Sequence, residues 1–253
     1  MRRKRVPADV FSVTVRRSQL DGGLYGYYGY SMILGNDVGS TKSAVFDAFA
    51  GVIKALANGH RLELLELMAQ GEHSVDTLAR MARMAVTTTS AHLQSLKKSG
   101  LVKTRRERST IYYSLAGDDV AELYVAAKRV ALSHSPQLRD AVVAYMSQPV
   151  SLAPTIDPSA VTSTMTVVDV RPRQEYEAGH FPGAVSIPLD NLPDRFSELP
   201  QDGELVVYCR GEFCRMAREA ATWLRAQGLD AKAMDEGIVE WRAAGECDLD
   251  QTA

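Results

Sequence analysis

Two cysteines and two arginines lie within seven residues in the string CRGEFCR, from Cys209 to Arg215. The residues before it, LVVY, have the composition of a buried strand, and helical spacing begins at about Cys214. A cysteine between a strand and a helix N-terminus faces convergent backbone N–H groups, which stabilise a thiolate or a bound anion. Arg210 adds positive charge, and Gly211 permits a tight bend. We therefore predict that Cys209 is a thiolate nucleophile that needs no separate base.

Cys214 follows Cys209 by five residues on the same loop. If the loop curls, the two sulfurs come within disulfide range, and Cys214 is then a resolving thiol. The alternative is that Cys214 is only a small residue at the start of a helix. Cys247 is near the C-terminus and is expected to be a bystander.

The elements around this loop alternate between strand and helix patterns. Strand-like runs are TVVDV, AVSIP, LVVYC and AKAM, and helices are expected near residues 189–199, 214–227 and 236–244. This alternation predicts an α/β domain over residues 159–253, with a mostly parallel sheet and helices on both faces. Residues 148–158 contain three prolines in eleven residues and are expected to form a linker.

The first half of the chain has helical patterns instead. Helices are predicted at about Ser43–Leu56, His60–Ala69, Val75–Met81, Val86–Ser99 and Asp118–Tyr145, with a β-hairpin in LVKTRRERSTIYYSL after the fourth. This order predicts a mainly α winged helix-turn-helix over residues 43–147, which binds DNA. Residues 1–42 are basic and rich in glycine and tyrosine, and we expect a disordered arm there.

One face of the predicted helix at Val86–Ser99 suits a DNA major groove. At 100° per residue, Thr89, Leu93 and Leu96 share the core side, and the outer face is small, polar and cationic. The predicted DNA-binding residues are Thr87, Thr88, Ser90, Ala91, Gln94 and Lys98 on this helix, with Arg105, Arg106 and Arg108 in the hairpin. The alternative is a helical protein-interaction domain with a solvated polar face.

Charge is divided unevenly along the chain. Residues 1–116 carry 17 Lys/Arg and 9 Asp/Glu, whereas residues 155–253 carry 9 and 18. The first part can therefore approach phosphate, and the second is repelled by it. The chain contains no apolar run of bilayer length and no signal-peptide pattern, and its three cysteines form no paired framework. We expect a cytoplasmic protein with no membrane partner.

Residues 43–125, which include RLELLELMAQ and AVTTTSAHLQSLKKSGLVKTRRERSTIYYSL, resemble the ArsR family of regulators. The resemblance implies a homodimer, built on the first and last helices, that binds a palindromic operator in double-stranded DNA. Metal-sensing members carry cysteines in the third helix or paired Asp/His ligands on the last one, and this sequence has neither. We therefore expect no metal site, no cofactor and a different input signal.

Residues 167–188 (VVDVRPRQEYEAGHFPGAVSIP) and 235–241 (DEGIVEW) resemble the two signatures of rhodanese domains. The resemblance implies transfer of sulfane sulfur from a small donor, such as thiosulfate or polysulfide, through a persulfide on Cys209. Its implied catalytic group comprises Cys209, Arg210 and Arg215, with Asp169 and Arg171 as support. The backbone of Gly211, Glu212 and Phe213 would form the anion cradle.

The spacing C-x5-R, completed by Arg215, departs from the usual rhodanese loop and is similar to that of rhodanese-fold phosphatases and arsenate reductases. This chemistry is an alternative, although no carboxylate can be assigned as its acid. The string YCRGEFC itself resembles the loop of ArsR–rhodanese fusions. Two hypotheses follow: a repressor whose operator affinity depends on the sulfur state of Cys209, and a sulfurtransferase whose helical part serves as a dimeriser or DNA tether.

Overall fold

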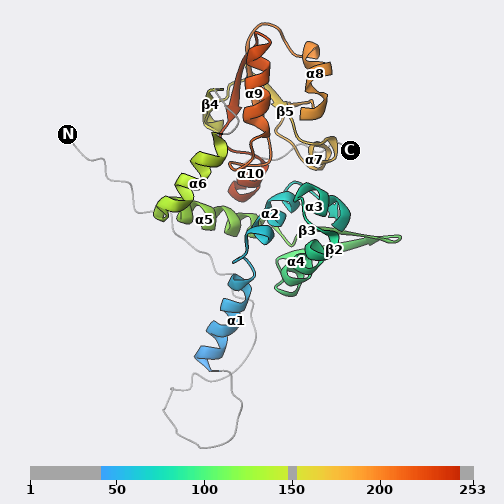
Figure 1. The fold of residues 1–253 in the computed structure, drawn as a ribbon, viewed down its shortest axis with the longest axis vertical. Helices are drawn as coiled ribbons and strands as arrows, with labels where there is room; N and C mark the ends of the chain where they lie inside the picture. The colour runs from blue at the N-terminus through green and yellow to red at the C-terminus, as the bar shows by residue number, and fades with distance from the viewer. Residues whose placement is uncertain (1–40, 148–152, 246–253) are drawn as a thin grey trace, which may run out of the picture. The chain divides into compact units, whose positions relative to one another are not determined.

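The computed structural model describes residues 41–147 and 153–245 (Figure 1). Most of the predicted N-terminal arm, and Cys247, lie outside the described residues. We refer to residues 41–147 as the helical half and to residues 153–245 as the α/β half. The helical half contains α1 (Lys42–Lys54), α2 (Gly59–Met68), β1 (His73–Ser74), α3 (Val75–Met81), α4 (Val86–Lys98), β2 (Val102–Glu107), β3 (Thr110–Leu115), α5 (Asp118–His134) and α6 (Pro136–Met146).

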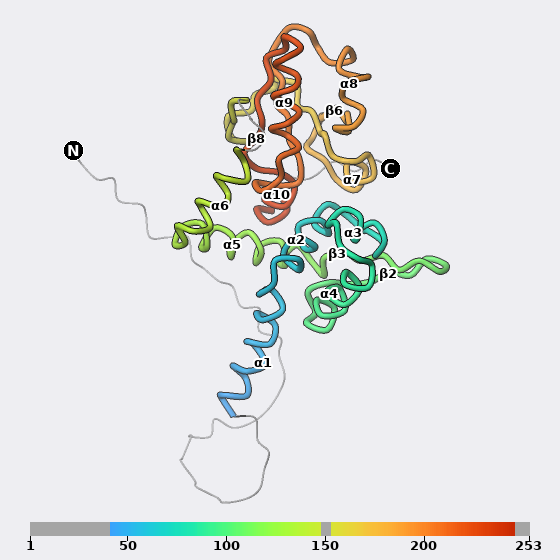
Figure 2. The backbone as a smooth tube through the Cα atoms, in the orientation of Figure 1, coloured from blue at the N-terminus to red at the C-terminus, as the bar shows by residue number. Residues whose placement is uncertain are grey.

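The helix-turn-helix and the wing form as the hydrophobic pattern predicts. Thr89, Leu93 and Leu96 are the buried residues of α4, and the two leucines pack with α2 in one core. Strands β2 and β3 pair antiparallel, and the short strand β1 adds to the other edge of β3. Figure 2 shows the β2–β3 hairpin projecting beside α4, which is the arrangement of a winged helix-turn-helix.

The prediction of a single long helix from Asp118 to Tyr145 is wrong, because the structure has two helices there, α5 and α6. Pro136 is the first residue of α6, where its missing N–H is tolerated, and the Ser135 side chain caps the helix by accepting from the Leu138 N–H at 3.2 Å. The Arg139 guanidinium donates to the Leu132 carbonyl, 2.7 Å away, at the end of α5. Pro136 and the Ser135 cap were the sequence signals for this break.

The α/β half contains β4 (Thr155–Ile156), β5 (Thr166–Asp169), α7 (Arg173–Ala178), β6 (Val185–Ser186), α8 (Leu192–Arg195), β7 (Glu204–Tyr208), α9 (Met216–Ala226), β8 (Asp230–Met234) and α10 (Ile238–Ala244). Three single turns of 3-10 helix lie at Pro158–Ala160, Leu189–Asn191 and Phe196–Glu198. The five strands form one parallel sheet in the order β4-β8-β7-β5-β6, so β7 is central.

Alternate residues of β7 belong to two different cores. Leu205 and Val207 pack with the buried face of α9, and Cys209 joins that core. Val206 and Tyr208 pack on the opposite side, with Trp241 of α10. Both faces of the sheet are therefore covered, as the alternating sequence pattern predicts.

Strand β4 lies within the stretch predicted as a linker. It pairs in parallel with β8, and backbone bonds from Ala233 N to Pro154 O (2.9 Å) and from Asp235 N to Ile156 O (3.1 Å) flank the pairing. The end of that proline-rich stretch is thus an edge strand of the sheet, and edge strands tolerate prolines. The remaining domain boundaries stay predictions. Among the described residues, no helix has the length and apolarity needed to cross a bilayer.

Candidate functional site

Cys209 is the first residue after β7, and the loop it begins runs to the start of α9 at Met216. We call residues 209–215 the thiol loop. The Cys209 side chain is only 3% exposed, and its thiol donates to the backbone carbonyl of Cys214 across 3.3 Å. Both cysteines are reduced, and the loop curls so that Cys214 lies beside Cys209, as its interpretation as a resolving thiol requires.

Both sulfurs affect where the negative charge of the site lies, whereas the sequence analysis assigns the thiolate to Cys209 alone. The pKa of Cys214 is lowered to about 7, first by a hydrogen bond from the Cys209 thiol and further by the charge of Arg210. The pKa of Cys209 is raised, mainly by burial and by that same hydrogen bond. In the reduced pair, Cys214 is thus the thiolate and Cys209 the proton donor, because two adjacent buried sulfurs do not both ionise.

Backbone amides converge on both sulfurs. The N–H groups of Gly211 and Ala217 face Cys209 and favour its ionised form, and those of Arg210 and Met216 do the same for Cys214. Within the predicted cradle, the Glu212 N–H instead points to the Glu240 carboxylate at 3.4 Å. The Phe213 ring lies 5.0 Å from the Lys128 ammonium group. The structure therefore brings the Gly211 amide to the sulfur and directs the Glu212 amide toward Glu240, and the cradle role of the Phe213 amide stays a prediction.

The two predicted support residues form a buried ion pair beneath the loop. Arg171 and Asp169 are both fully buried, and their charged groups approach to 2.6 Å. Asp169 also accepts from the Tyr208 hydroxyl at 2.6 Å, which ties the pair to the last residue of β7. The Arg171 guanidinium donates further to the Gly179 carbonyl at 2.8 Å. Each charge is thus compensated, as a buried ion pair requires.

The two loop arginines point in different directions. Arg210 forms a bidentate pair with Glu175 of α7, with its closest contact at 2.6 Å, and it adds positive charge near the sulfurs. The Arg215 guanidinium lies over the Tyr145 ring of α6, 4.6 Å from its centroid, and contacts Glu219 at 3.5 Å. The two loop arginines therefore contact different elements, Arg210 on α7 and Arg215 on α6 and α9.

The helical half supplies residues to this site that sequence reasoning missed. Gln70, which follows α2 and is 1% exposed, donates to the Arg210 carbonyl at 3.2 Å and accepts from Arg171 at 3.1 Å. Lys128 of α5 pairs with Glu240 and, at 3.1 Å, with Glu212. The signal in the sequence was weak: two polar residues four apart, Glu66 and Gln70, near the apolar end of this helix.

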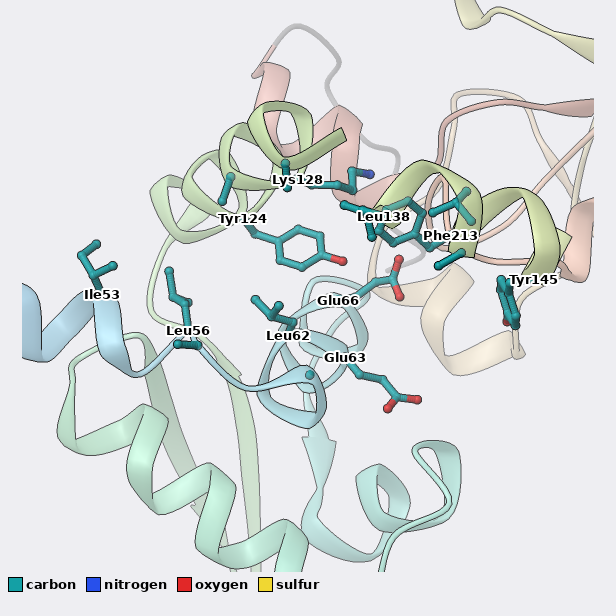
Figure 3. Close-up of a pocket in the computed structure, with 16 residues that line it drawn as sticks. Ile53, Leu56, Leu62, Glu63, Glu66, Tyr124, Lys128, Leu138, Tyr145 and Phe213 are labelled. Carbon is teal, nitrogen blue, oxygen red and sulfur yellow. The ribbon is translucent and has the colours of Figure 1, made fainter. Parts of the chain in front are cut away.

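Glu66 of α2 lies against the thiol loop. A Cβ atom on Gly211 would lie 3.1 Å from its Oε1 atom, which is buried and has no hydrogen-bond partner in the described structure. Burial raises the pKa of Glu66 to about 8, with smaller contributions from the charges of Cys214 and Glu240. Glu66 also lines an apolar cavity of about 680 Å³, together with the Tyr124 and Phe213 rings (Figure 3).

The predicted DNA-binding face of α4 is open to solvent. Thr87, Thr88, Ala91, Gln94 and Lys98 are exposed and Ser90 is partly exposed, opposite the buried residues of the helix. The Gln94 amide donates to the Tyr113 hydroxyl of β3 at 3.1 Å, so the helix face and the wing are joined at this point.

The three wing arginines are all exposed, but their surroundings differ. Arg105 is paired with Glu72 at 2.7 Å and with Glu107 at 2.9 Å, and it stacks on Tyr112. Arg106 donates to the Arg108 carbonyl at 3.1 Å, at the turn of the hairpin. Among the described residues, no cluster of His, Cys, Asp or Glu has the arrangement of a metal site.

Comparisons with known proteins agree with this division of the chain. The family of bacterial regulatory proteins of the arsR type matches residues 58–104, and the rhodanese-like domain matches residues 156–244. The HTH-type transcriptional regulator Rv0324 of Mycobacterium tuberculosis is 44% identical over 206 residues, which cover 81% of this chain and 91% of that protein. A sulfurtransferase of Allochromatium vinosum is 32% identical over 87 residues, which cover 34% of this chain and 79% of that protein.

Among solved structures, the homodimeric winged helix-turn-helix DNA-binding fragment of Mb0332 from Mycobacterium bovis is 46% identical. That match covers 41% of this chain and 94% of the fragment, with a TM-score of 0.36. A winged helix-turn-helix joined to a rhodanese-like sheet defines a two-part transcriptional regulator. The chain belongs to the ArsR family of transcriptional regulators and carries a C-terminal rhodanese-like domain.

Proposed function

We propose that this regulator is a repressor that senses sulfane sulfur, and that its operator affinity changes when Cys209 carries a persulfide or is bridged to Cys214. The observation that carries the proposal is the contact of the thiol loop with the helical half, through Gln70 and Lys128. A free-energy coupling of about 1–3 kcal/mol between the two halves is enough for a useful switch. Because its target is DNA, the proposal also places the protein in the cytoplasm.

The cysteine pair supports a balanced sulfur transfer. The Cys214 thiolate takes the proton of the Cys209 thiol, and the Cys209 thiolate then attacks the outer sulfur of thiosulfate. The S–S bond of the donor breaks, sulfite leaves with the electron pair, and Cys209 retains a persulfide anion. Attack by Cys214 on the inner sulfur of that persulfide forms a Cys209–Cys214 disulfide, and its proton leaves with the departing sulfur as hydrosulfide.

The same proposal includes a homodimer on a palindromic operator. None of the thirteen residues of α1, all within the described range, is buried, and Phe46 and Phe49 are 59% and 61% exposed. A cavity of about 680 Å³, lined mainly by apolar residues of α1, α2, α5 and α6, lies in the same chain (Figure 3). We propose that α1 of a second copy packs against it, with one of its two end lysines, Lys42 or Lys54, near the acidic Glu63 on its wall. Light scattering should show dimers for the wild type and monomers for Phe46→Asp/Phe49→Asp.

Operator binding before and after polysulfide treatment tests the sensing proposal. We expect the affinity of the wild type to change at least about fivefold on treatment and to return with a thiol reductant. Cys209→Ser should bind the operator and show no response. Intact-protein mass spectrometry on the same samples identifies the added sulfur. If the modified and unmodified wild type bind DNA equally well, the sensing proposal is refuted.

A second candidate function is sulfur transfer by turnover, which the likeness of the α/β half to a sulfurtransferase supports. A cyanide-dependent thiocyanate assay with thiosulfate distinguishes the two. Turnover that is lost in Cys209→Ser supports an enzyme, and the absence of turnover leaves sensing alone. Release of phosphate from an ester, or reduction of arsenate, would instead support the C-x5-R alternative.

A further inference from the structure

We propose that Gln70, which belongs to the helical half, is a positioning residue of the thiol site, and that it transmits the sulfur state of Cys209 to α2. This inference rests on the proposed function and adds the residue through which regulation acts. Gln70 contacts no sulfur atom. It acts through the peptide group that joins Arg210 to Gly211.

That peptide group is held from two sides. Its carbonyl, on Arg210, accepts from the Gln70 side chain at 3.2 Å and from the Val239 N–H of α10 at 3.1 Å. Its N–H, on Gly211, faces the Cys209 sulfur. Because a trans peptide is planar, with its C=O and N–H on opposite sides, fixing the carbonyl also aims the N–H. Gln70 and α10 therefore orient one of the amides that stabilise negative charge on Cys209.

The Gln70 amide makes two further hydrogen bonds. Its oxygen accepts from Arg171 at 3.1 Å, and its nitrogen also donates to the Glu66 carbonyl of α2 at 3.0 Å. One buried side chain thus joins the loop, the buried ion pair beneath the loop and the end of α2. Neighbouring Gly237 has no room for a side chain, because a Cβ there would overlap the Cys209 carbonyl and the Gly211 nitrogen. A shift of the loop backbone therefore requires Gln70 to shift with it.

This connection makes the two halves thermodynamically linked. A persulfide anion on Cys209 places the charge one atom farther from the Cys209 Cβ, so the 210–211 peptide must shift to follow it, and Gln70 must shift with the peptide. Helix α2 shares its core with the buried leucines of α4, the predicted DNA-reading helix. If the sulfur state biases the position of α2, then DNA binding biases the equilibrium between thiol and persulfide by the same factor.

The test compares full-length Gln70→Met with the wild type. Methionine fills similar volume and makes none of these three hydrogen bonds. Gln201→Met is the matched control, because the Gln201 amide donates only to the Leu199 carbonyl of its own half at 2.8 Å. Gln70→Glu is the second variant, which keeps an acceptor for Arg171 and loses the donor to Arg210. Each protein is assayed for its alkylation rate against pH, for persulfide formation and for operator affinity with and without polysulfide.

We expect the apparent pKa of Cys209 to rise by about one unit in both Gln70 variants, a tenfold change in its ionised fraction, because the Gly211 N–H that favours its ionised form is no longer held in place. The response of operator affinity to polysulfide should fall from at least about fivefold to less than about twofold, and Gln201→Met should match the wild type. A wild-type pH profile and a wild-type response in Gln70→Met would overturn the inference. Failure of the wild type itself to gain sulfur on Cys209 would instead defeat the proposed function.

Discussion

Cys209 and Cys214 behave as one chemical group because a single proton serves both sulfurs. Burial alone would leave Cys209 protonated, and Cys214 supplies a neighbouring base that takes its proton. The amides at the end of β7 then stabilise whichever sulfur is negative. At the level of side chains, the two cysteines are therefore expected to react as a pair.

The pH dependence of alkylation tests this pair. In a Cys247→Ser background, the rate for the unmodified pair should rise with pH and reach half its maximum near pH 7, because the pKa of Cys214 is lowered to about 7. Cys214→Ser removes that thiolate, so the half-maximum should shift upward by more than one pH unit. Cys209→Ala removes the hydrogen-bond donor and should also shift it upward. An unchanged profile in Cys214→Ser contradicts the pair.

The buried ion pair beneath the loop should be costly to break. We expect Arg171→Met to lower the free energy of unfolding by about 3–5 kcal/mol, because it leaves Asp169 charged and buried. Arg173→Met is the control: its pair with Glu177 is exposed, and its loss should cost less than about 0.5 kcal/mol. Urea unfolding of both variants measures the difference, and equal stabilities would show that Asp169 is not held as a buried charge.

The predicted DNA-binding residues of α4 and of the wing differ in whether residues from other elements hold them. Helix α4 presents an open polar face opposite Leu93 and Leu96, so its role follows from its own sequence. The wing is different, because Arg105 is paired with Glu72, a residue from outside the hairpin. The three wing arginines are therefore not equivalent, although the sequence treats them alike.

Salt dependence of operator binding distinguishes the wing arginines. Arg106→Ala and Arg108→Ala should each weaken binding and reduce the slope of log K against log salt by about one, as expected for the loss of one phosphate contact. Arg105→Ala should change the slope less, because its charge is already compensated by Glu72 and Glu107. Equal losses in all three would mean that Arg105 leaves its carboxylates to bind DNA.

Across the whole molecule, the thiol site is built from both halves. Lys128 of α5 reaches Glu240 of α10 and Glu212 of the thiol loop. Arg242 of α10 donates to the Ala69 carbonyl at 2.6 Å. The rhodanese-like domain and the helical half therefore share polar contacts that are buried or partly buried.

Glu66, between the halves, should make stability depend on pH. Its folded pKa is raised to about 8 by burial, so the folded protein holds this proton more tightly than the unfolded chain does. Its contribution to stability is complete below the ordinary carboxyl value of 4.5 and is lost as the pH rises toward 8. Glu66→Gln should therefore gain stability relative to the wild type between pH 5 and pH 8.5. Glu122→Gln, on the exposed surface of α5, is the control, and thermal unfolding over this pH range measures both.

The sequence alone determined the elements and the chemical identity of the loop. Short-range periodicity located α2, α3, α4, the wing and strands β5 to β8, because each element buries one face at its own repeat. The position of Cys209, between β7 and α9, follows from local order along the chain. The break at Pro136 was also present in the sequence, and we gave the apolar stripe more weight than the proline.

Only the tertiary structure decided what surrounds the thiol. Gln70 and Arg210 are 140 positions apart, and no local pattern brings the Gln70 side-chain amide to a loop that follows β7. The division of charge between Cys209 and Cys214 likewise depends on burial and on neighbours from several elements. Side-chain spacing encodes which faces are apolar, whereas packing between distant segments sets the dielectric and the partners of each buried group. For that reason, the reactive residue could be named from the sequence, and its environment could not.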